Sequence, residues 1–258
     1  MTEKLKPWPY PLWIAHRGAG RLAPENTMSA FRLGAAHGWR MFECDAKLSR
    51  DGVLFLLHDA ELARTTNGQG LGSAHGMGEL AQLDAGSWHS RAYAGEPLPT
   101  LEALVRWCLA NHLLLNIEIK PTPGQEEPTG RAVAELLKRI WPRDTTPALL
   151  TSFKPVALQA ARETAPHIPR GLLADKLAGS PGDESGDAEL FTALELGCSA
   201  MVLNHALWDQ PLVDKVHDAG LRCLSYTVND AWAAERLTAL GTDGIISDRV
   251  DLFSPAQI

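Results

Sequence analysis

The stretch LLLNIEIK (residues 113–120) decides the fold class. It is a short, nearly continuous apolar run, which is typical of a strand buried on both faces. The segment before it, LEALVRWCLANH (101–112), carries its apolar residues at helical spacing. A helix followed by a fully buried strand is the repeating unit of parallel α/β folds, so this stretch predicts an α/β protein.

The same alternation of short apolar runs and helix-like stretches continues through the chain. The other strand-like runs are LWIAH (12–16), WRMFECD (39–45), VLFLLHD (53–59), PALLTSF (147–153), RGLLAD (170–175), AMVLN (200–204), LRCLSYTV (221–228) and DGIIS (243–247). About eight units of a strand followed by a helix predict a closed parallel (β/α)8 barrel, the TIM barrel. The alternative is an open doubly wound sheet. That fold would favour a GxGxxG loop after the first strand, and HRGAG (16–20) does not have this pattern.

Composition limits the class of protein. The chain has 258 residues, of which 45% are hydrophobic and 21% charged. Because α/β barrels of about 250 residues are single domains, we predict one domain over residues 1–258. The net charge is −7 and no run is rich in Lys and Arg, so we expect no nucleic-acid partner. A small anionic substrate stays open, because a local cluster of cations or a metal can override the overall charge.

The predicted location is the cytoplasm. The N-terminal MTEKLKPWPYPLW contains three prolines and lacks the apolar core of a signal peptide. No run approaches the roughly 18 apolar residues that span a bilayer, so no transmembrane segment is expected. The cysteines form no CxxC pair and lie among apolar neighbours, which predicts reduced core thiols. The sequence leaves the oligomeric state open, including a homodimer.

One region interrupts the alternation of strands and helices. Residues 60–99 are rich in Gly, Ala and turn-forming residues, with isolated aromatics at Trp88 and Tyr93. A connection of this length is usually a functional loop or a small subdomain. In a barrel, an insertion between a strand and its following helix lies at the C-terminal mouth. We therefore predict a small cap, inserted after the second strand.

Polar side chains that a packed core would exclude stand at the ends of the first three predicted barrel strands. They are His16 and Arg17, Glu43 and Asp45, and Glu118 and Lys120, with His58 and Asp59 in the segment after the second strand. Active sites of (β/α)8 barrels form at the C-terminal ends of the strands. The coincidence on three strands predicts a catalytic site, although each pair alone could be a local ion pair.

Strand geometry predicts a metal site within this group. Because side chains alternate between faces, Glu43 and Asp45 point the same way, and Glu118 points with Lys120. Three converging carboxylates repel one another unless a cation neutralises them. Oxygen ligands select Mg²⁺, Ca²⁺ or Mn²⁺, whereas zinc favours His and Cys. The sequence does not choose among these three metals.

The remaining polar groups suit an anionic substrate. Arg17 and Lys120 could pair with a phosphate. If His16 and His58 face each other, they form an acid/base pair that works near neutral pH. We interpret the other histidines singled out in the sequence as structural: His37, His89, His112, His167, His205 and His217.

These residues, taken in order, resemble those of the glycerophosphodiester phosphodiesterases. The matching stretches are AHRGAGRLAPENTMSAF, FECDAKLSRDGVLFLLHDAELARTTNGQG, LDAGSW, GEPLPTLEAL, NIEIK, SYTVND and TDGIISD, which run from residue 15 almost to the C-terminus. HRG followed by PENT, ExD, and HD with RTT is a specific ordered set, whereas HRG alone would be weak. The resemblance implies a (β/α)8 barrel with a cap after the second strand, and metal-dependent hydrolysis of glycerophosphodiesters to glycerol 3-phosphate and an alcohol.

The resemblance also implies a role for each matching residue. His16 and His58 become the general acid/base pair, and Glu43, Asp45 and Glu118 become the ligands of one divalent cation. Arg17 and Lys120 become the phosphate-binding groups. Tyr226 stands where the family typically has Trp, and the resemblance implies that this smaller aromatic ring stacks against glycerol. The departure bears on the fine specificity more than on the reaction. In PENT, Glu25 is expected to have a structural role.

Several points stay open at this stage. The sequence does not give the alcohol, which histidine accepts the proton, or whether a glycerol hydroxyl or water attacks the phosphate. A phosphodiesterase of the same fold that acts on lysophospholipids or phosphoinositides is the nearer alternative, since Leu71, Met77, Leu80 and Trp88 of the cap could form an apolar rim. A non-catalytic barrel is the more distant one, and it would have lost some of the site residues.

Overall fold

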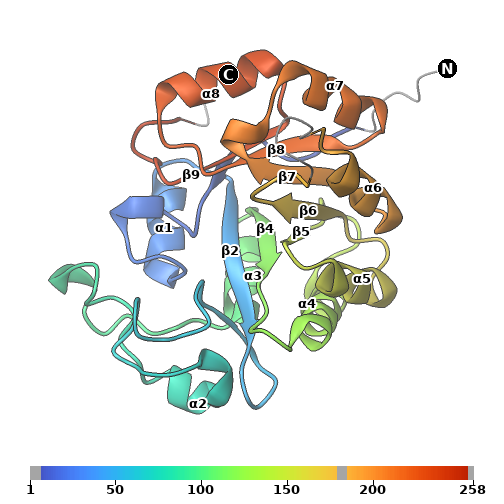
Figure 1. Ribbon diagram of the computed structural model, residues 1–258. Coiled ribbons are helices and arrows are strands. Elements are labelled where there is room, and N and C mark those ends of the chain that lie inside the picture. The colour runs from blue at the N-terminus through green and yellow to red at the C-terminus, as the bar shows by residue number, and fades with distance from the viewer. Residues whose placement is uncertain (1–6, 179–184, 255–258) are drawn as a thin grey trace.

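Eight parallel strands close into a barrel in the computed structural model, which describes residues 7–178 and 185–254 (Figure 1). They are β1 (Trp13–Ala15), β2 (Met41–Leu48), β4 (Leu114–Ile119), β5 (Leu149–Ser152), β6 (Arg170–Ala174), β7 (Ala200–Asn204), β8 (Arg222–Tyr226) and β9 (Gly244–Ser247). Each strand pairs with the next, and β1 pairs with both β2 and β9, so the sheet has no open edge here. The predicted (β/α)8 barrel is confirmed, and the open doubly wound sheet is wrong.

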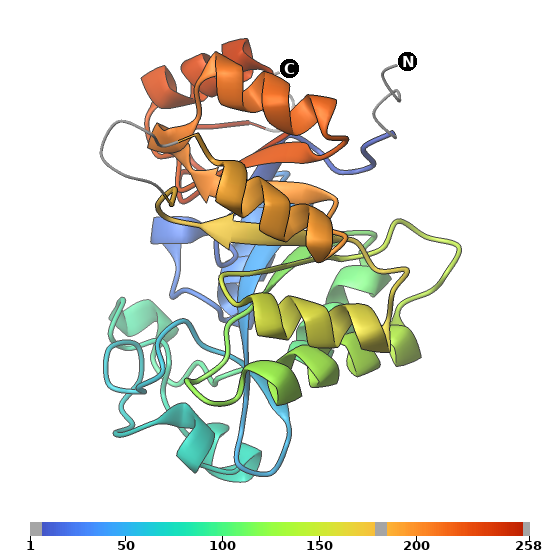
Figure 2. The ribbon, with the colours of Figure 1, turned by 45° about the vertical axis from the view of Figure 1, so that its right-hand side comes forward.

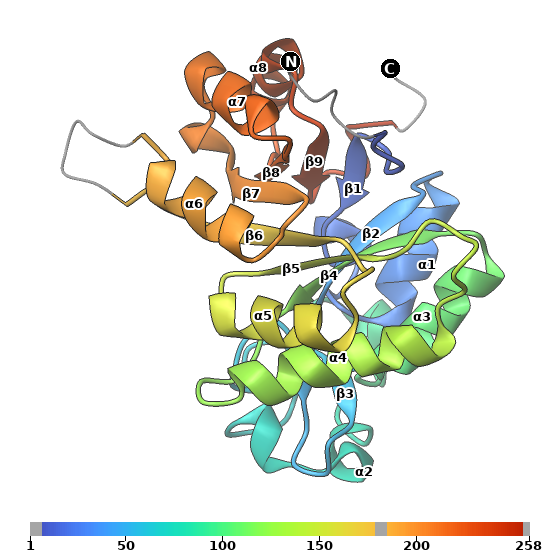
Figure 3. The same ribbon diagram turned by 90° about the vertical axis from the view of Figure 1, so that its right-hand side faces the viewer.

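Helices surround the barrel in the order that the sequence predicts. They are α1 (Met28–Ala36), α3 (Leu101–Ala110), α4 (Glu126–Ile140), α5 (Pro155–Thr164), α6 (Asp187–Glu195), α7 (Gln210–Asp218) and α8 (Ala231–Leu240). Asp230 caps α8 by accepting a hydrogen bond from the Ala233 N–H, and Gly241 ends it with a φ of 82°. In Figure 3, α4 and α5 lie side by side. Gly130 permits this contact, because a Cβ at that position would lie 2.2 Å from the Ala157 carbonyl oxygen.

The run VLFLLHD does not become a barrel strand. Its β3 (Leu54–Leu56) is antiparallel to the end of β2, with Ala46 opposite Leu56. The resulting hairpin leads into residues 60–99, which contain η2 (Gly72–Ala74), α2 (Met77–Leu80) and η3 (Arg91–Tyr93). A separate apolar cluster holds this segment together: Phe55, Leu57, Leu62, Leu80, Ala85 and Leu98. Figure 2 shows residues 60–99 at the lower left, outside the ring of helices.

The barrel interior away from the C-terminal mouth is packed with apolar side chains. Ile14, Met41, Leu149, Val202, Leu224 and Ile246 form this core. Two aromatic residues before β1 join it: the rings of Trp8 and Tyr10 lie 4.7 Å apart, and the Tyr10 hydroxyl donates to the Pro147 carbonyl at 2.9 Å. This apolar filling leaves the C-terminal ends of the strands as the place where a polar cavity can form. None of the described helices has the length and apolar character needed to cross a membrane.

Candidate active site

The three predicted metal ligands meet at the mouth of the barrel. Oxygen atoms of Glu43, Asp45 and Glu118 all lie within 4.8 Å of one another. The strand register explains this convergence, because Asp45 on β2 pairs directly with Glu118 on β4. Cys44, between the two acidic residues of β2, points away into the apolar core. Period-two alternation thus turns Glu43 and Asp45 to the same side of the sheet.

A cavity of about 170 Å³ adjoins these carboxylates. Its lining includes His16, Arg17, Glu43, His58, Asn116, Glu118, Lys120, Thr151, Phe153, Leu173, Tyr226, Thr227 and Ile246. Residues that the sequence analysis selected on five separate segments therefore share one space. Asp45 lies immediately beside it, through its contacts with Arg17 and Lys120.

The acidic cluster carries opposing pKa shifts. Burial, followed by the charges of Asp45 and Glu118, raises the pKa of Glu43 well above its usual value. Burial and the Asp45 charge raise the pKa of Glu118 to about 7. For Asp45, burial also acts to raise the pKa, but the charges of Arg17 and Lys120 outweigh it and hold this pKa far below its usual range. The charges of Arg17 and Lys120 thus outweigh burial at Asp45, whereas at the two glutamates burial and the neighbouring carboxylates outweigh them.

Arg17 and Lys120 occupy part of the space around the carboxylates. The Arg17 backbone N–H donates to Glu43 Oε2 at 3.0 Å, and its Nε lies 3.2 Å from Asp45 Oδ2. Lys120 Nζ lies 2.8 Å from Glu118 Oε1 and 3.3 Å from Asp45 Oδ1.

Gly18, next to Arg17, has a φ of 102°, and a Cβ there would lie 2.7 Å from the Cβ of Ala30. Glycine at this position lets the first loop turn against α1 and bring Arg17 to the cluster.

The cluster nevertheless keeps free acceptors. Among the described residues, Glu43 Oε1 is buried with neither a hydrogen bond nor an ion pair, and Asp45 Oδ1 is buried with no hydrogen bond and only Lys120 Nζ nearby, at 3.3 Å. Buried carboxylate oxygens without partners are costly unless something else binds them. A divalent cation with oxygen preference fits such a donor set. The three carboxylates are thus suited to hold one, alongside the ion pairs with Arg17 and Lys120.

Both predicted acid/base residues have an aspartate partner. His16 Nδ1 lies 2.6 Å from Asp248 Oδ1, and His58 Nδ1 lies 2.6 Å from Asp59 Oδ1. A carboxylate on Nδ1 fixes the ring and leaves Nε2 as the working nitrogen. Both imidazoles line the cavity, with His16 Nε2 at 3.8 Å from Glu43 Oε2. The arrangement can accept a proton at one Nε2 and donate one from the other.

Asp248 is a residue that the sequence analysis missed. It follows β9, the eighth barrel strand, as His16 follows β1 and Lys120 follows β4. Burial acts to raise its pKa, but the hydrogen bond from His16, the His16 charge and the hydrogen bond from Asn229 together outweigh burial and lower it. Asn229 Nδ2 donates to its other oxygen at 2.9 Å. The signal was present: a polar residue at the end of a barrel strand.

Asn26 and Arg64 were also missed, and both support the predicted residues. Asn26 Nδ2 donates to Asp45 Oδ2 at 2.8 Å, and its Oδ1 accepts from the Asp45 N–H. Arg64, from residues 60–99, donates to both oxygens of Glu25 and to Asp59. Glu25 in turn accepts from Arg17 at 2.9 Å. Arg64 thus connects Glu25, the partner of Arg17, to Asp59, the partner of His58.

Lys47 is buried two positions after Asp45. Its Nζ donates to the Lys120 carbonyl at 2.8 Å. Burial lowers the pKa of this lysine to about 8. Its hydrogen bond ties the end of β4 to β2 and so helps to hold Lys120 in place.

Tyr226 lies on the far side of the cavity from the acidic cluster's strands, at the end of β8. Its hydroxyl donates to the Ala174 carbonyl at 2.9 Å, and its ring meets the Phe153 ring edge-on at 5.8 Å. Lys120 Nζ lies 5.7 Å from the centre of the Phe153 ring. Because the hydroxyl has a partner, the aromatic ring is what Tyr226 offers to a ligand.

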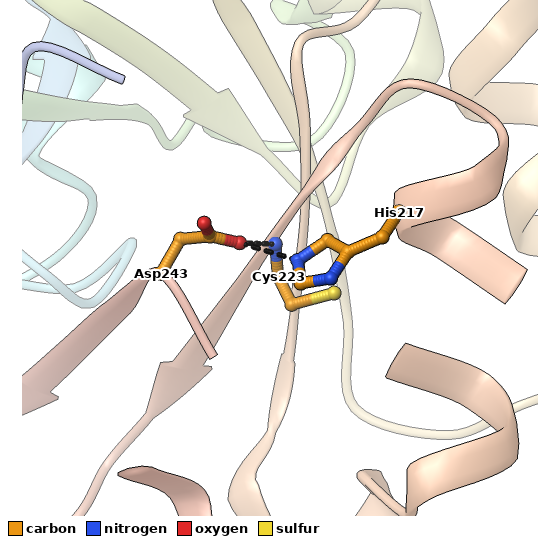
Figure 4. Close-up of side chains that lie close together, drawn as sticks. All are labelled: His217, Cys223 and Asp243. Atoms are coloured by element: carbon orange, nitrogen blue, oxygen red, sulfur yellow. Dashed lines mark hydrogen bonds and ion pairs between the residues drawn. The ribbon is translucent and has the colours of Figure 1, made fainter. Parts of the chain in front are cut away.

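A second group with ligand-type side chains lies at the other end of the barrel (Figure 4): His217, Cys223 and Asp243. Asp243 accepts hydrogen bonds from His217 Nε2, Arg222 and the Cys223 N–H at 2.7–2.8 Å. Burial, followed by the Asp243 charge, raises the pKa of the Cys223 thiol, so this sulfur stays protonated. We interpret the group as a structural network, because its carboxylate already has three donors.

The fold and the site define a class: a (β/α)8-barrel enzyme with an acidic cluster and paired histidines at the mouth. Residues 16–252 match the model of the glycerophosphoryl diester phosphodiesterase family. The chain therefore belongs to this family, which consists of phosphoric diester hydrolases, as the sequence predicted.

Relatives of known name agree with this assignment. The glycerophosphodiester phosphodiesterase of Caldanaerobacter subterraneus subsp. tengcongensis is 31% identical, over 92% of this chain and 93% of its own length. A phosphodiesterase from Oleispira antarctica, solved with the product sn-glycerol-3-phosphate, is 36% identical with a TM-score of 0.84, covering 92% of this chain and 93% of that one. A glycerophosphodiester phosphodiesterase from Agrobacterium tumefaciens is 28% identical with a TM-score of 0.77, covering 95% and 99%.

Proposed function

We propose that this enzyme hydrolyses glycerophosphodiesters, such as glycerophosphocholine or glycerophosphoethanolamine, to glycerol 3-phosphate and an alcohol. The observation that carries the proposal is the pair of histidines, each with an aspartate on Nδ1, which line one cavity with the acidic cluster. The related enzyme from Oleispira antarctica with bound sn-glycerol-3-phosphate supports this choice of product.

Glu43, Asp45 and Glu118 are the proposed ligands of one divalent cation, Mg²⁺, Ca²⁺ or Mn²⁺. The unpartnered Oε1 of Glu43 supports this role, as does the raised pKa of both glutamates. When bound, the cation would offset the negative charge that the substrate phosphate brings to this acidic site. Asn26 holds Asp45 through two hydrogen bonds and so fixes one ligand.

Arg17 and Lys120 are the proposed phosphate-binding groups. Both line the cavity, and both border the carboxylates that would hold the cation. They would place the phosphorus between the two imidazoles. The rings of Tyr226 and Phe153 form the apolar wall against which the glycerol carbons would pack. Residues 60–99 act as the cap of this site, since Arg64 joins them to Glu25 of the first loop.

His16 and His58 are the proposed proton carriers. One Nε2 accepts the proton of the attacking oxygen as that oxygen bonds to phosphorus. The other Nε2 donates a proton to the alcohol oxygen as its bond to phosphorus breaks. The attacking oxygen belongs either to the neighbouring glycerol hydroxyl, giving a cyclic phosphate that water opens, or to water itself. A general acid or base of this kind contributes about 10²–10⁴ in rate.

The test is hydrolysis of a panel of glycerophosphodiesters and one lysophospholipid, with and without chelator, adding back one metal at a time. We expect chelator-sensitive release of glycerol 3-phosphate and a loss of about 10² or more in kcat for His16→Ala and for His58→Ala. Calorimetric titration with Mn²⁺ should show weaker binding to Glu43→Gln, with Glu102→Gln, a half-buried glutamate on α3 outside the cavity, as the matched control. Faster turnover of the lysophospholipid, or turnover of both histidine variants within a few-fold of the wild type, would overturn the proposal.

A further inference from the structure

A second hollow lies directly against the first. It has a volume of about 310 Å³ and shares His16 and Arg17 with the inner cavity. Its other lining residues are Gly20, Arg21, Ala23, Glu25, Trp88, His89 and Asp248. They come from η1 (Gly20–Leu22) and the loop after it, from the cap, and from the end of β9. A substrate whose phosphate lies at His16 and Arg17 therefore has space on both sides.

The walls of this outer hollow are fixed by direct contacts between the cap and the first loop. His89 Nε2 lies 3.0 Å from the Arg21 carbonyl, and the Tyr93 hydroxyl reaches the Leu22 carbonyl at 3.5 Å. Trp88 Nε1 donates to the Ala85 carbonyl at 2.9 Å, while 43% of this residue stays exposed. The Trp88 ring is therefore held in one orientation and still presents a surface to a ligand.

The carboxylates that line the outer hollow are already paired. Glu25 accepts from both Arg17 and Arg64, and Asp248 accepts from His16 and Asn229. Arg21 differs, because its guanidinium has no hydrogen bond or ion pair among the residues that the structure describes, and it is exposed. The outer hollow therefore offers a ligand the positive charge of Arg21, although the net charge of the whole chain is −7.

We propose that the outer hollow is the subsite for the departing alcohol and that Arg21 favours alcohols that carry a carboxylate or phosphate group. This inference rests on the proposed function, because it needs a phosphodiester at His16 and Arg17. The glycerol phosphate half occupies the inner cavity, next to Tyr226 and the acidic cluster. The alcohol half extends past His16 toward Arg21 and Trp88. A guanidinium is well suited to pair with a carboxylate.

Two substrates test the charge preference directly. Glycerophosphoserine and glycerophosphoethanolamine differ only by one carboxylate on the alcohol. We expect the wild type to show a kcat/KM for the serine ester that is about two- to fivefold higher, which is the scale of an exposed ion pair. Arg21→Ala should bring this ratio close to one, and Arg21→Glu should invert it. The preference should also shrink in about 0.5 M NaCl, because salt screens exposed charges.

Arg32→Ala is the matched control, since Arg32 is an exposed arginine on α1 outside both hollows. It should keep the wild-type ratio. An equal ratio in wild type, Arg21→Ala and Arg32→Ala would overturn the subsite while leaving the proposed function in place. A preference for glycerophosphocholine that Trp88→Ala removes would overturn the anionic assignment in favour of a cation–π site. Failure to hydrolyse any glycerophosphodiester would instead overturn the proposed function, and the subsite with it.

Discussion

His16 Nδ1 lies 2.6 Å from Asp248 Oδ1, although 232 residues separate the two in sequence. Closure of the barrel explains the contact, because Ala15 on β1 pairs with Ser247 on β9. The residues that follow these two strands must then be neighbours at the mouth. The first and last strands of the barrel therefore together position one member of the proposed acid/base pair.

The first prediction concerns this pair. In Asp248→Asn the side chain keeps its size but loses the charge that stabilises a protonated His16. We expect kcat to fall by about 10- to 10³-fold, with a smaller change in KM, because the loss is felt when the imidazole carries the proton. Steady-state kinetics on glycerophosphoethanolamine measure both parameters. A variant that folds normally and keeps kcat within twofold of the wild type would show that Asp248 does not support His16.

The second prediction concerns the stability of the metal-free protein. Burial and the Asp45 charge raise the pKa of Glu118 from its ordinary value of 4.5 to about 7. Below pH 4.5 this carboxyl is protonated in both the folded and the unfolded chain. Between pH 4.5 and 7 it ionises first in the unfolded chain, so folding stability falls as the pH rises. The loss attributable to Glu118 should reach up to about 3 kcal/mol by neutral pH.

Chemical denaturation of wild type and Glu118→Gln, with chelator, measures this loss as a difference between the two pH profiles. The variant should show a smaller fall between pH 4.5 and 7, because only Glu43, whose pKa is also raised, then contributes to it from this cluster. Saturating Mg²⁺, Ca²⁺ or Mn²⁺ should also suppress it in the wild type, because a cation favours the ionised carboxylates of the folded state. Parallel profiles for the two proteins would mean that Glu118 is not held in the environment described.

The third prediction separates the network at the opposite end of the barrel from the active site. Asp243→Asn weakens the contacts that His217, Arg222 and the Cys223 N–H make with the carboxylate. We expect a loss of about 2–3 kcal/mol in unfolding free energy, because these donors are largely buried. The kcat per folded molecule should not change. A rise in the wild-type melting temperature on adding Zn²⁺, absent in the variant, would contradict the structural interpretation.

The part of the site that could be predicted is the part that depends on local periodicity. Alternation along one strand places Glu43 with Asp45, and the position of His16 at the end of an apolar run marks the mouth. The contacts of Asp248 and Asn26 depend instead on which strands and loops become neighbours after closure. No local pattern contains that information.

The run VLFLLHD shows the same limit for the fold. It has the composition of a buried strand, and it forms β3, yet it pairs antiparallel with β2 outside the barrel. The turn signal before it, SRDG (49–52), allows a tight hairpin, and a hairpin connects antiparallel strands. Pairing with β2 thus determines the direction of β3, whereas the composition of the run indicates only that it forms a strand.

The last prediction concerns the link between the cap and the two halves of the site. Arg64 donates to Glu25, which holds Arg17, and to Asp59, which holds His58. Arg64→Met keeps much of the side-chain length but removes every donor, so two carboxylates lose a partner at once. We expect kcat/KM to fall by about tenfold or more, from looser placement of Arg17 and His58.

Arg64→Lys separates this positioning role from simple charge. A lysine keeps the positive charge but cannot span two carboxylates with a planar fork of donors, so it should recover only part of the lost rate. Arg32→Ala again serves as the control for removing an exposed arginine. If Arg64→Lys matched the wild type in both kcat and KM, a cation near Glu25 and Asp59 would suffice, and the geometry of the guanidinium would not matter. If Arg64→Met were also unchanged, the cap would have no part in placing His58.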